Sequence, residues 1–222
     1  DERPRRSVTL NGFYLDKYEV TVAQYRRCLQ AGKCTDYHIL GDEWGSKPYA
    51  ASSSCNFGQS GREDHPMNCV DWSQAAAYCA WAGKRLPTEA EWEKAARGND
   101  ARKYAWGNEE PSCRRAVMDD GGKGCREGHT WAVGRKTTGA SPYGAMDLTG
   151  NVWEWVADWY GKDYYAQGPD RNPSGPTYGD SRVLRGGAWS GAAKLMRAND
   201  RFFDPPTIRH GGVGFRCSRS QQ

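Results

Sequence analysis

Three helices are predicted within the first hundred residues by the pattern at their starts. Each segment opens with a hydroxyl or carboxylate side chain and carries Gln or Glu three positions later, which is the spacing of a capping box. The pairs are Thr21 with Gln24, Asp71 with Gln74, and Thr88 with Glu91. In the third segment, Trp92, Ala95 and Ala96 fall on one helical face. A glycine is expected to end each helix, at Gly32, Gly83 and Gly98.

The segment before the first helix predicts a β-hairpin. Apolar and polar residues alternate on both sides of Asn11-Gly12, a dipeptide that strongly favours a tight turn. Residues 7–20 are therefore expected to form two paired strands. After Arg97 no further long helix is predicted, and short strands are expected at 130–133, 152–159, 183–184 and 214–217.

One long stretch, residues 33–68, holds no periodic segment. It is rich in Ser, Gly, Asp and Asn, so it predicts a loop that needs covalent cross-links to stay ordered. Along the whole chain, helices and strands follow one another without βαβ periodicity, and no repeat or linker divides them. The sequence therefore predicts one α+β domain over residues 1–222 with little regular secondary structure.

The composition changes the expected core. Only 37% of the residues are hydrophobic, below the usual value of about 45–50%. The chain nevertheless holds 10 Trp, 12 Tyr and 5 Phe. Because each large ring can bury roughly 150–250 Å², we expect a loop-rich domain whose core is aromatic more than aliphatic.

The charge pattern argues against nucleic acid as a partner. The net charge is +4, with both signs interleaved along the chain. The only dense basic cluster is Arg3, Arg5 and Arg6, beside Asp1 and Glu2, whereas nucleic-acid binders usually carry a basic stripe or face. No run of about 18 apolar residues and no signal peptide is present. We therefore expect a mature or excised domain, with any membrane anchor outside this chain.

Eight cysteines indicate an oxidising compartment. None forms a C-x-x-C pair, and none of the four histidines stands at zinc-finger spacing from a cysteine pair. An even number without metal-binding spacing predicts disulfides and hence an extracytoplasmic location: periplasmic, secreted or cell-surface. Eight cysteines allow 105 pairings. Proximity along the chain suggests Cys28–Cys34, Cys55–Cys69 and Cys113–Cys125.

Five motifs, in a fixed order, carry a family resemblance. They are PMNCVDW at 66–72, AYCAWAGKRLPTEAEWE at 77–93, GNVWEW at 150–155, RGG at 185–187 and GFRC at 214–217. With them the chain resembles the formylglycine-generating enzyme (sulfatase-modifying factor) family over residues 12–218. The resemblance implies a single α+β domain with a C-type-lectin-like core. It also implies a disulfide between Cys79 and Cys217.

The resemblance does not extend to the catalytic cysteines. The family's enzymes use copper, held by two cysteines after the Gly-Gly motif, and oxygen to oxidise a sulfatase cysteine to formylglycine. Here residues 186–197 contain no cysteine, and Met196 alone is not a soft-metal site. We expect no copper and no catalytic residue. An iron site, as in a second branch of the superfamily, would have to come from four scattered histidines, His38, His65, His129 and His210.

Structural calcium is the cofactor that the resemblance implies. The side chains of Asp147 and Glu154 and the main-chain carbonyls of Gly150 and Val152 would be the ligands, a hard-oxygen set that suits Ca²⁺. Alternatively, Asp147 caps a turn and Glu154 is a solvated strand residue. A second family calcium site would fall at 117–131. There Val117 stands where a side-chain oxygen is needed, Asp119 and Asp120 are the possible substitutes, and a Cys113–Cys125 disulfide is the alternative way to fix the loop.

The segment after Gly187 is the predicted ligand-binding surface, because in the enzymes this region lines the groove for an extended substrate peptide. Consecutive Phe202 and Phe203, beside Asp204 and two prolines, are more typical of recognition than of a core strand. The alternative is that both rings are buried. The candidate residues are Trp189, Lys194, Met196, Asn199, Phe202, Phe203, Asp204, Thr207 and His210.

Three functions remain from the sequence. The first is a catalytically inactive, extracytoplasmic sensor or recognition module for a protein, peptide or glycan ligand. The second is a structural or assembly domain. The third is a metal-dependent oxidase of the sulfatase-modifying family that acts on a protein cysteine. The first is the function we expect.

Overall fold

The computed structural model describes residues 3–40 and 52–221. Part of the predicted loop at 33–68, residues 41–51, lies outside this description. The helices are α1 (Val22–Gln30), α2 (Trp72–Trp81), α3 (Glu89–Arg97) and the short α4 (Tyr164–Gln167). The strands are β1 (Phe13–Leu15), β2 (Trp153–Trp159), β3 (Arg182–Arg185), β4 (Phe202–Asp204), β5 (Val213–Phe215) and β6 (Ser218–Ser220). Two 3-10 turns lie at Thr137–Gly139 and Ala193–Leu195.

The three predicted helices are confirmed, and so are their caps. In each case the cap side chain accepts a hydrogen bond from the backbone N–H three residues on, and the Gln or Glu side chain there returns to the cap backbone. These reciprocal bonds satisfy two N–H groups that would otherwise lack partners at the helix start. The caps are Thr21, Asp71 and Thr88.

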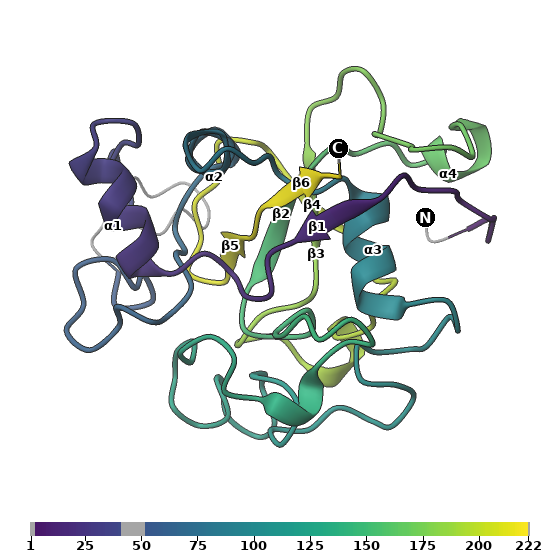
Figure 1. Ribbon diagram of the computed structural model, residues 1–222. Coiled ribbons are helices and arrows are strands. Elements are labelled where there is room, and N and C mark those ends of the chain that lie inside the picture. Colours follow the sequence, from purple (N-terminus) through teal and green to yellow (C-terminus); the bar gives the residue numbers. More distant parts are fainter. Residues whose placement is uncertain (1–2, 41–51, 222) are drawn as a thin grey trace.

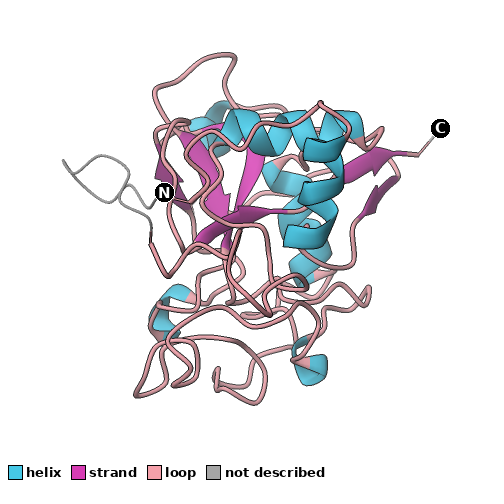
Figure 2. Cartoon of the chain, turned by 90° about the vertical axis from the view of Figure 1, so that its left-hand side faces the viewer, coloured by secondary structure: helices cyan, strands magenta, loops and turns pink. Residues whose placement is uncertain are grey.

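A four-stranded sheet divides the upper part of the molecule (Figure 1). Its order is β4-β3-β2-β5, with β2 and β5 parallel and the other pairs antiparallel. Trp155 and Leu184 point to the side of α1 and α2, whereas Val156 and Val183 point to α3. The sheet therefore lies between two helical layers. Loops make up most of the lower part of the molecule as drawn in Figure 2.

The predicted hairpin at 7–20 is wrong. Strand β1 pairs with β6 at the other end of the chain, Phe13 opposite Ser220. The first half of the expected hairpin pairs elsewhere: the N–H of Thr9 donates to the carbonyl of Asp170 (2.7 Å), and its own carbonyl accepts from Asn172 (2.9 Å). Long-range pairing thus overrides the local turn signal of Asn11-Gly12.

The strand predictions have mixed outcomes. Those at 152–159 and 183–184 correspond to β2 and β3. The stretch at 214–217 covers the end of β5 and the link to β6. The strand at 130–133 is wrong: Thr130 is buried in a loop, where its hydroxyl bonds to Asn56 and His65 instead of a strand partner. Strand β4 was not predicted, because a strand of three residues is too short to show an alternation of apolar and polar side chains.

The core is aromatic, as the composition predicts. The largest fully buried side chains include Trp92, Trp155, Tyr25, Tyr104 and Phe215. Four disulfides reinforce this small core, and they account for all eight cysteines. The pairings that proximity and resemblance suggested are all confirmed: Cys28–Cys34, Cys55–Cys69, Cys113–Cys125 and Cys79–Cys217. None of the helices within residues 3–40 and 52–221 has the length and apolar character needed to cross a bilayer.

Candidate functional site

Strand β4 places two aromatic rings at the edge of the sheet. Phe202 and Phe203 are 38% and 41% exposed, so the alternative that both are buried is excluded. Consecutive strand residues point to opposite faces, and each ring rests on a different neighbour. Phe202 stacks on Trp153 with ring centroids 5.5 Å apart, and Phe203 stacks on Tyr160 at 3.8 Å. The exposed rings are therefore held in fixed positions, which lowers the entropy that a ligand contact would cost.

On the face that Phe202 shares with α2, an arginine lies between two indole rings. The guanidinium carbon of Arg182 is 3.7 Å from the ring centroid of Trp72 and 3.5 Å from that of Trp159. Burial lowers the pKa of Arg182 to about 10. Asp204 lies opposite Arg182 in the β3–β4 register, and burial raises the pKa of its carboxyl above the ordinary value. This face thus combines flat aromatic area with half-buried polar groups, as recognition surfaces do.

The opposite face, under Phe203, is fixed by an ion pair. Arg201 precedes Phe202 and points to the same side as Phe203. Its guanidinium carbon lies 5.1 Å from the Tyr160 ring centroid, and its Nε and Nη2 donate to the two carboxylate oxygens of Glu89 at 2.7 and 2.9 Å. Because both partners are buried, this bidentate pair ties β4 to the start of α3 and limits movement of the edge strand.

The nine predicted ligand-binding residues do not line one groove. Trp189 and Met196 are buried and do not face a ligand: the Trp189 indole donates to the Gly211 carbonyl, and Met196 packs in a separate cluster with Tyr104. Lys194 lies beside Tyr104 and Glu110 in a broad hollow of about 580 Å³. The remaining residues are distributed over other parts of the surface: Asn199 beside a separate cavity near α3, Thr207 on an exposed loop, and His210 beside the Cys55–Cys69 disulfide.

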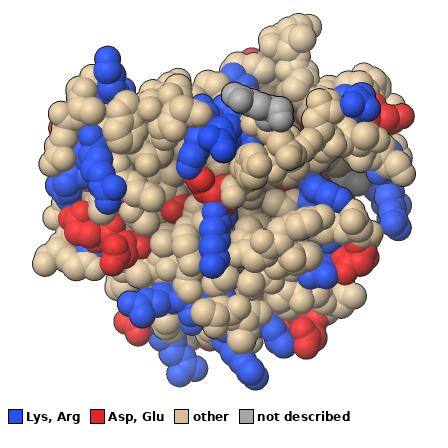
Figure 3. Space-filling view, in the orientation of Figure 1, with Lys and Arg blue, Asp and Glu red and all other residues tan. Residues whose placement is uncertain are grey.

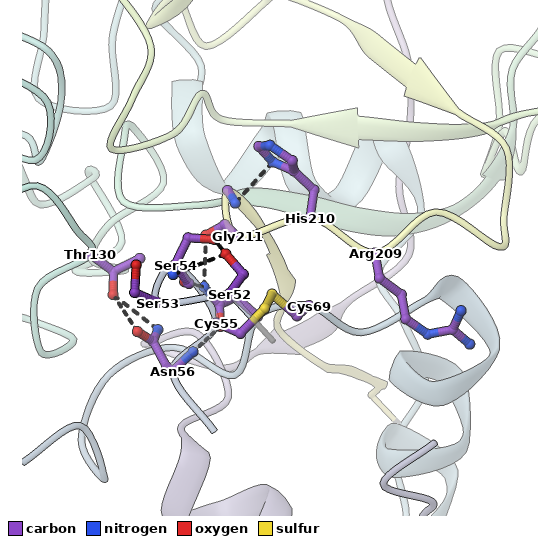
Figure 4. The surroundings of a disulfide bond; sticks show 12 residues. Ser52, Ser53, Ser54, Cys55, Asn56, Cys69, Thr130, Arg209, His210 and Gly211 are labelled. Atoms are coloured by element: carbon purple, nitrogen blue, oxygen red, sulfur yellow. Dashed lines mark hydrogen bonds between the residues drawn. A yellow bond between two sulfur atoms is a disulfide. The ribbon is translucent and has the colours of Figure 1, made fainter. Parts of the chain in front are cut away.

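The loop that carries Thr207 and His210 is anchored at both ends. Arg209 donates to the carboxylate of Asp71 at the α2 cap and to the side chain of Gln74. In Figure 4 the side chain of Arg209 and the ring of His210 both point away from the disulfide, in different directions. The His210 Nδ1 accepts from the N–H of Gly212 at 3.0 Å. Gly211 packs so closely against Ser54 that a Cβ there would lie 2.3 Å from the Ser54 hydroxyl.

The residues of the implied calcium site are buried, but Glu154 already has partners. Its Oε2 accepts from Arg216 Nε at 2.7 Å and from the Trp92 indole at 2.8 Å, and its Oε1 accepts from Arg216 Nη2 at 2.8 Å. Glu154 is therefore not a solvated strand residue. Asp147 has a positive φ of 59°, and its Oδ2 accepts from the N–H of Gly134 at 2.5 Å.

Sequence reasoning did not identify the carboxylate of Glu19, which belongs to the same buried cluster. Burial and the nearby charges of Asp147 and Glu154 raise the pKa of Glu19 well above its ordinary value. Its Oε1 is buried and accepts no hydrogen bond from the described residues. Three acids thus face two cations, Arg216 and, on the side of Asp147, Lys136, so one negative charge is left for a proton or a bound cation to balance. No three His, Cys, Asp or Glu side chains of the described part of the chain converge as a ready-made metal site.

The loop of the second implied calcium site is held by protein contacts. The Val117 carbonyl accepts from the N–H of Asn151 at 2.8 Å. Asp119 accepts from the N–H of Gly122 at 2.9 Å, and Asp120 accepts from the N–H of Cys113 at 3.4 Å. The Cys113–Cys125 disulfide closes this loop.

The distribution of surface charge agrees with the interleaved charges of the sequence. On the face drawn in Figure 3, basic and acidic side chains are interspersed, with no continuous basic stripe.

Comparison with known proteins places this α+β domain in the class of formylglycine-generating-enzyme, C-type-lectin-like folds. The chain matches the sulfatase-modifying factor enzyme 1-like domain over residues 1–221, and it belongs to that family. It is 35% identical over 258 residues to the formylglycine-generating enzyme of Streptomyces coelicolor, covering 98% of this chain and 81% of that enzyme. The solved structure of PvdO from Pseudomonas aeruginosa has a TM-score of 0.76 and 26% identity, covering 94% of this chain and 80% of that one.

Not all relatives are of this size. The serine/threonine-protein kinase pkn1 of Chlamydia pneumoniae is 37% identical over 227 residues, which cover 99% of this chain. The same match covers only 35% of the kinase. The chain therefore spans about a third of the length of that relative.

Proposed function

We propose that this domain is an extracytoplasmic recognition module that binds a protein, peptide or glycan ligand through the edge of its sheet and has lost the oxidase activity of its family. The observation that carries the proposal is the pair Phe202 and Phe203. Both rings are more than a third exposed, both are braced by a second aromatic ring, and both stand on an edge strand tied to the core. Rigid, exposed aromatic anchors are the usual centres of binding energy in recognition surfaces.

The cysteine inventory supports the loss of copper chemistry. A Cu(I) site of the family type needs two thiolates. All eight cysteines of this chain form disulfides, and none lies between Gly187 and Gly212. The four disulfides also support an extracytoplasmic location, because such bonds persist in oxidising compartments. The match to a third of a chlamydial kinase supports a role as one part of a larger protein.

Screening of a displayed random-peptide library and a glycan array with the purified domain tests the binding proposal. The matched variants are Phe202→Ser with Phe203→Ser, and Tyr178→Ser, which changes an 83% exposed ring elsewhere. Ligands that depend on the edge strand should lose roughly tenfold or more in affinity with the double variant and keep it with Tyr178→Ser. Ligands that bind all three proteins equally would contradict the proposal.

Two further measurements separate the alternatives. Sedimentation of the wild type and the double variant tests whether the chain is a structural or assembly domain. Self-association of the wild type that the double variant abolishes would favour that function. Incubation with copper, oxygen and a sulfatase-type cysteine peptide tests the oxidase, with aldehyde formation as the readout. Turnover would overturn the claim of inactivity, and we expect none.

A further inference from the structure

A cavity of about 460 Å³ lies between the N-terminal segment, α3 and α4, and neither Phe202 nor Phe203 lines it. Its walls are residues 4–8 and Leu10, the outward face of α3, Tyr164 and Tyr165 of α4, and Asn199. Asp158, near the end of β2, also lines it. The volume is in the range of small-molecule sites, roughly 300–1,000 Å³. The proposed recognition function does not use this cavity.

The two glutamates of the cavity already have cationic partners. Glu89 accepts two bonds from Arg201 and lies 3.2 Å from Nη1 of Arg185. Glu93 pairs with Arg185 at 2.7 Å and with Arg97 at 2.6 Å. These carboxylates are therefore neutralised by arginines in contact with them. The part of the cavity wall formed by Glu89, Glu93 and Asp158 is called the floor below, and its two glutamates do not present a free negative charge to a ligand.

Asp158 is the exception in the floor. Its side chain is buried, and its Oδ2 accepts from the N–H of Glu89 at 2.8 Å. Within residues 3–40 and 52–221, no group donates a hydrogen bond to its Oδ1. Burial and the neighbouring charge of Glu89 raise the pKa of Asp158 to about 8, so at neutral pH this carboxyl keeps its proton. It can then donate a hydrogen bond to a ligand in the cavity.

The rim of the cavity is cationic. Arg5 is exposed, and Lys94 donates to the neutral amide oxygen of Asn99. In the part of the chain that the structure describes, neither makes an ion pair. Arg6 also lines the cavity, and among the described residues its ion-pair partner is the exposed Asp170 at 3.7 Å. With the floor neutralised and Asp158 protonated, these side chains give the cavity a positive potential, which attracts anions.

We propose that this cavity binds a small organic carboxylate with a hydroxylated body, of the size and chemistry of a hexuronic acid. The ligand carboxylate pairs with Arg5 and Lys94 at the rim. The Asp158 carboxyl donates to a ligand oxygen at the floor, and the tyrosine rings of α4 and the amide of Asn199 contact the hydroxylated body. Charge-assisted bonds of this kind are roughly twice as strong as neutral ones.

Isothermal titration of the whole domain with sodium D-glucuronate and D-galacturonate tests this assignment, with D-glucose and inorganic phosphate as comparison ligands. We expect a uronate to bind at near-neutral pH and low salt, D-glucose not to bind, and added salt to weaken the binding. Arg5→Ala and Lys94→Ala should each weaken it by roughly 5- to 20-fold. Lys33→Ala, an exposed lysine after α1, is the matched control and should not change it.

Asp158 needs two variants, because a buried residue can affect folding. Asp158→Ala should weaken uronate binding by roughly tenfold, whereas Asp158→Asn keeps a donor and should retain it. Melting temperatures confirm that both variants are folded. The assignment is overturned if neither uronate binds, if D-glucose binds as well, if phosphate alone binds, or if the rim variants have no effect. The Phe202 and Phe203 variants should leave uronate binding unchanged, so failure here is distinguishable from failure of the recognition surface.

Discussion

Glu154 and Arg216 form a bidentate ion pair in the middle of the fold, with both side chains completely buried. Nη1 and Nη2 of Arg216 also donate to the carbonyls of Asp16, Lys17 and Met146. The pair thus joins β2, the segment after β5, the N-terminal segment and the loop before β2. Because regular secondary structure is sparse, this ion pair and its hydrogen bonds hold together segments that aliphatic packing joins in other domains.

Breaking this pair should be strongly destabilising. Glu154→Gln removes the carboxylate that pairs directly with the buried guanidinium of Arg216 and leaves only the more distant charges of Glu19 and Asp147. Breaking a buried pair in this way typically costs about 3–5 kcal/mol. Urea unfolding followed by tryptophan fluorescence measures the change. The exposed pair Lys103–Glu110 provides the control, because Glu110→Gln removes a solvent-screened contact and should leave the unfolding midpoint almost unchanged. Equal midpoints for the two variants would refute the importance of the buried pair.

The four disulfides should contribute unequally. In the chain-entropy description, stabilisation grows with the length of the closed loop. Cys79 and Cys217 are 138 residues apart and Cys28 and Cys34 only six, which gives about 5 and about 2.4 kcal/mol respectively. The Cys79→Ala, Cys217→Ala protein should therefore unfold at lower urea than the Cys28→Ala, Cys34→Ala protein. The reverse order would show that loop closure is not the main contribution.

Features with local causes could be predicted from the sequence. Each capping box is complete within four residues, so Thr21, Asp71 and Thr88 marked their helices correctly. Three of the disulfides close loops of 6 to 14 residues, where proximity along the chain is a fair guide to proximity in space. The order of helices and strands indicated the α+β class. The fourth disulfide and the C-type-lectin-like core needed the family resemblance, because no local pattern contains them.

Features made by distant residues could not be predicted in this way. Strand β1 pairs with a segment some 200 residues away, so the Asn11-Gly12 turn signal was misleading. In the sequence, Glu89 is one of several acids in the first turns of a helix, where a carboxylate favours the N-terminal end of the helix dipole. In the structure it also binds Arg201, 112 residues further on. The predicted ligand residues were adjacent in sequence, but the chain turns repeatedly between 189 and 210 and distributes them over several surfaces.

Calcium should stabilise the domain if the excess buried carboxylates bind it. The melting temperature should then be higher in millimolar CaCl₂ than in EDTA, because a ligand bound only by the folded state shifts the unfolding equilibrium. Glu19→Gln or Asp147→Ala should reduce this difference. Asp119→Asn, in the loop closed by the Cys113–Cys125 disulfide, is the control and should not. No difference between CaCl₂ and EDTA would mean that protons, not a cation, balance this cluster.

The raised pKa of Asp158 predicts a pH dependence of stability with a definite sign. Between about pH 4 and pH 8 the folded protein holds a proton on Asp158 that the unfolded chain has released. The free energy of unfolding from this group therefore falls as pH rises through that range. Asp158→Asn keeps the acceptor for the N–H of Glu89 and cannot ionise, so it should remove this fall. The difference in melting temperature between Asp158→Asn and the wild type should be at least about 2 °C larger, in favour of the variant, at pH 8 than at pH 5. Calorimetry at matched ionic strength measures it. The control Tyr178→Ser should show no pH-dependent gain in melting temperature. If Asp158→Asn gains the same number of degrees at both pH values, Asp158 is already ionised in the folded protein at pH 5.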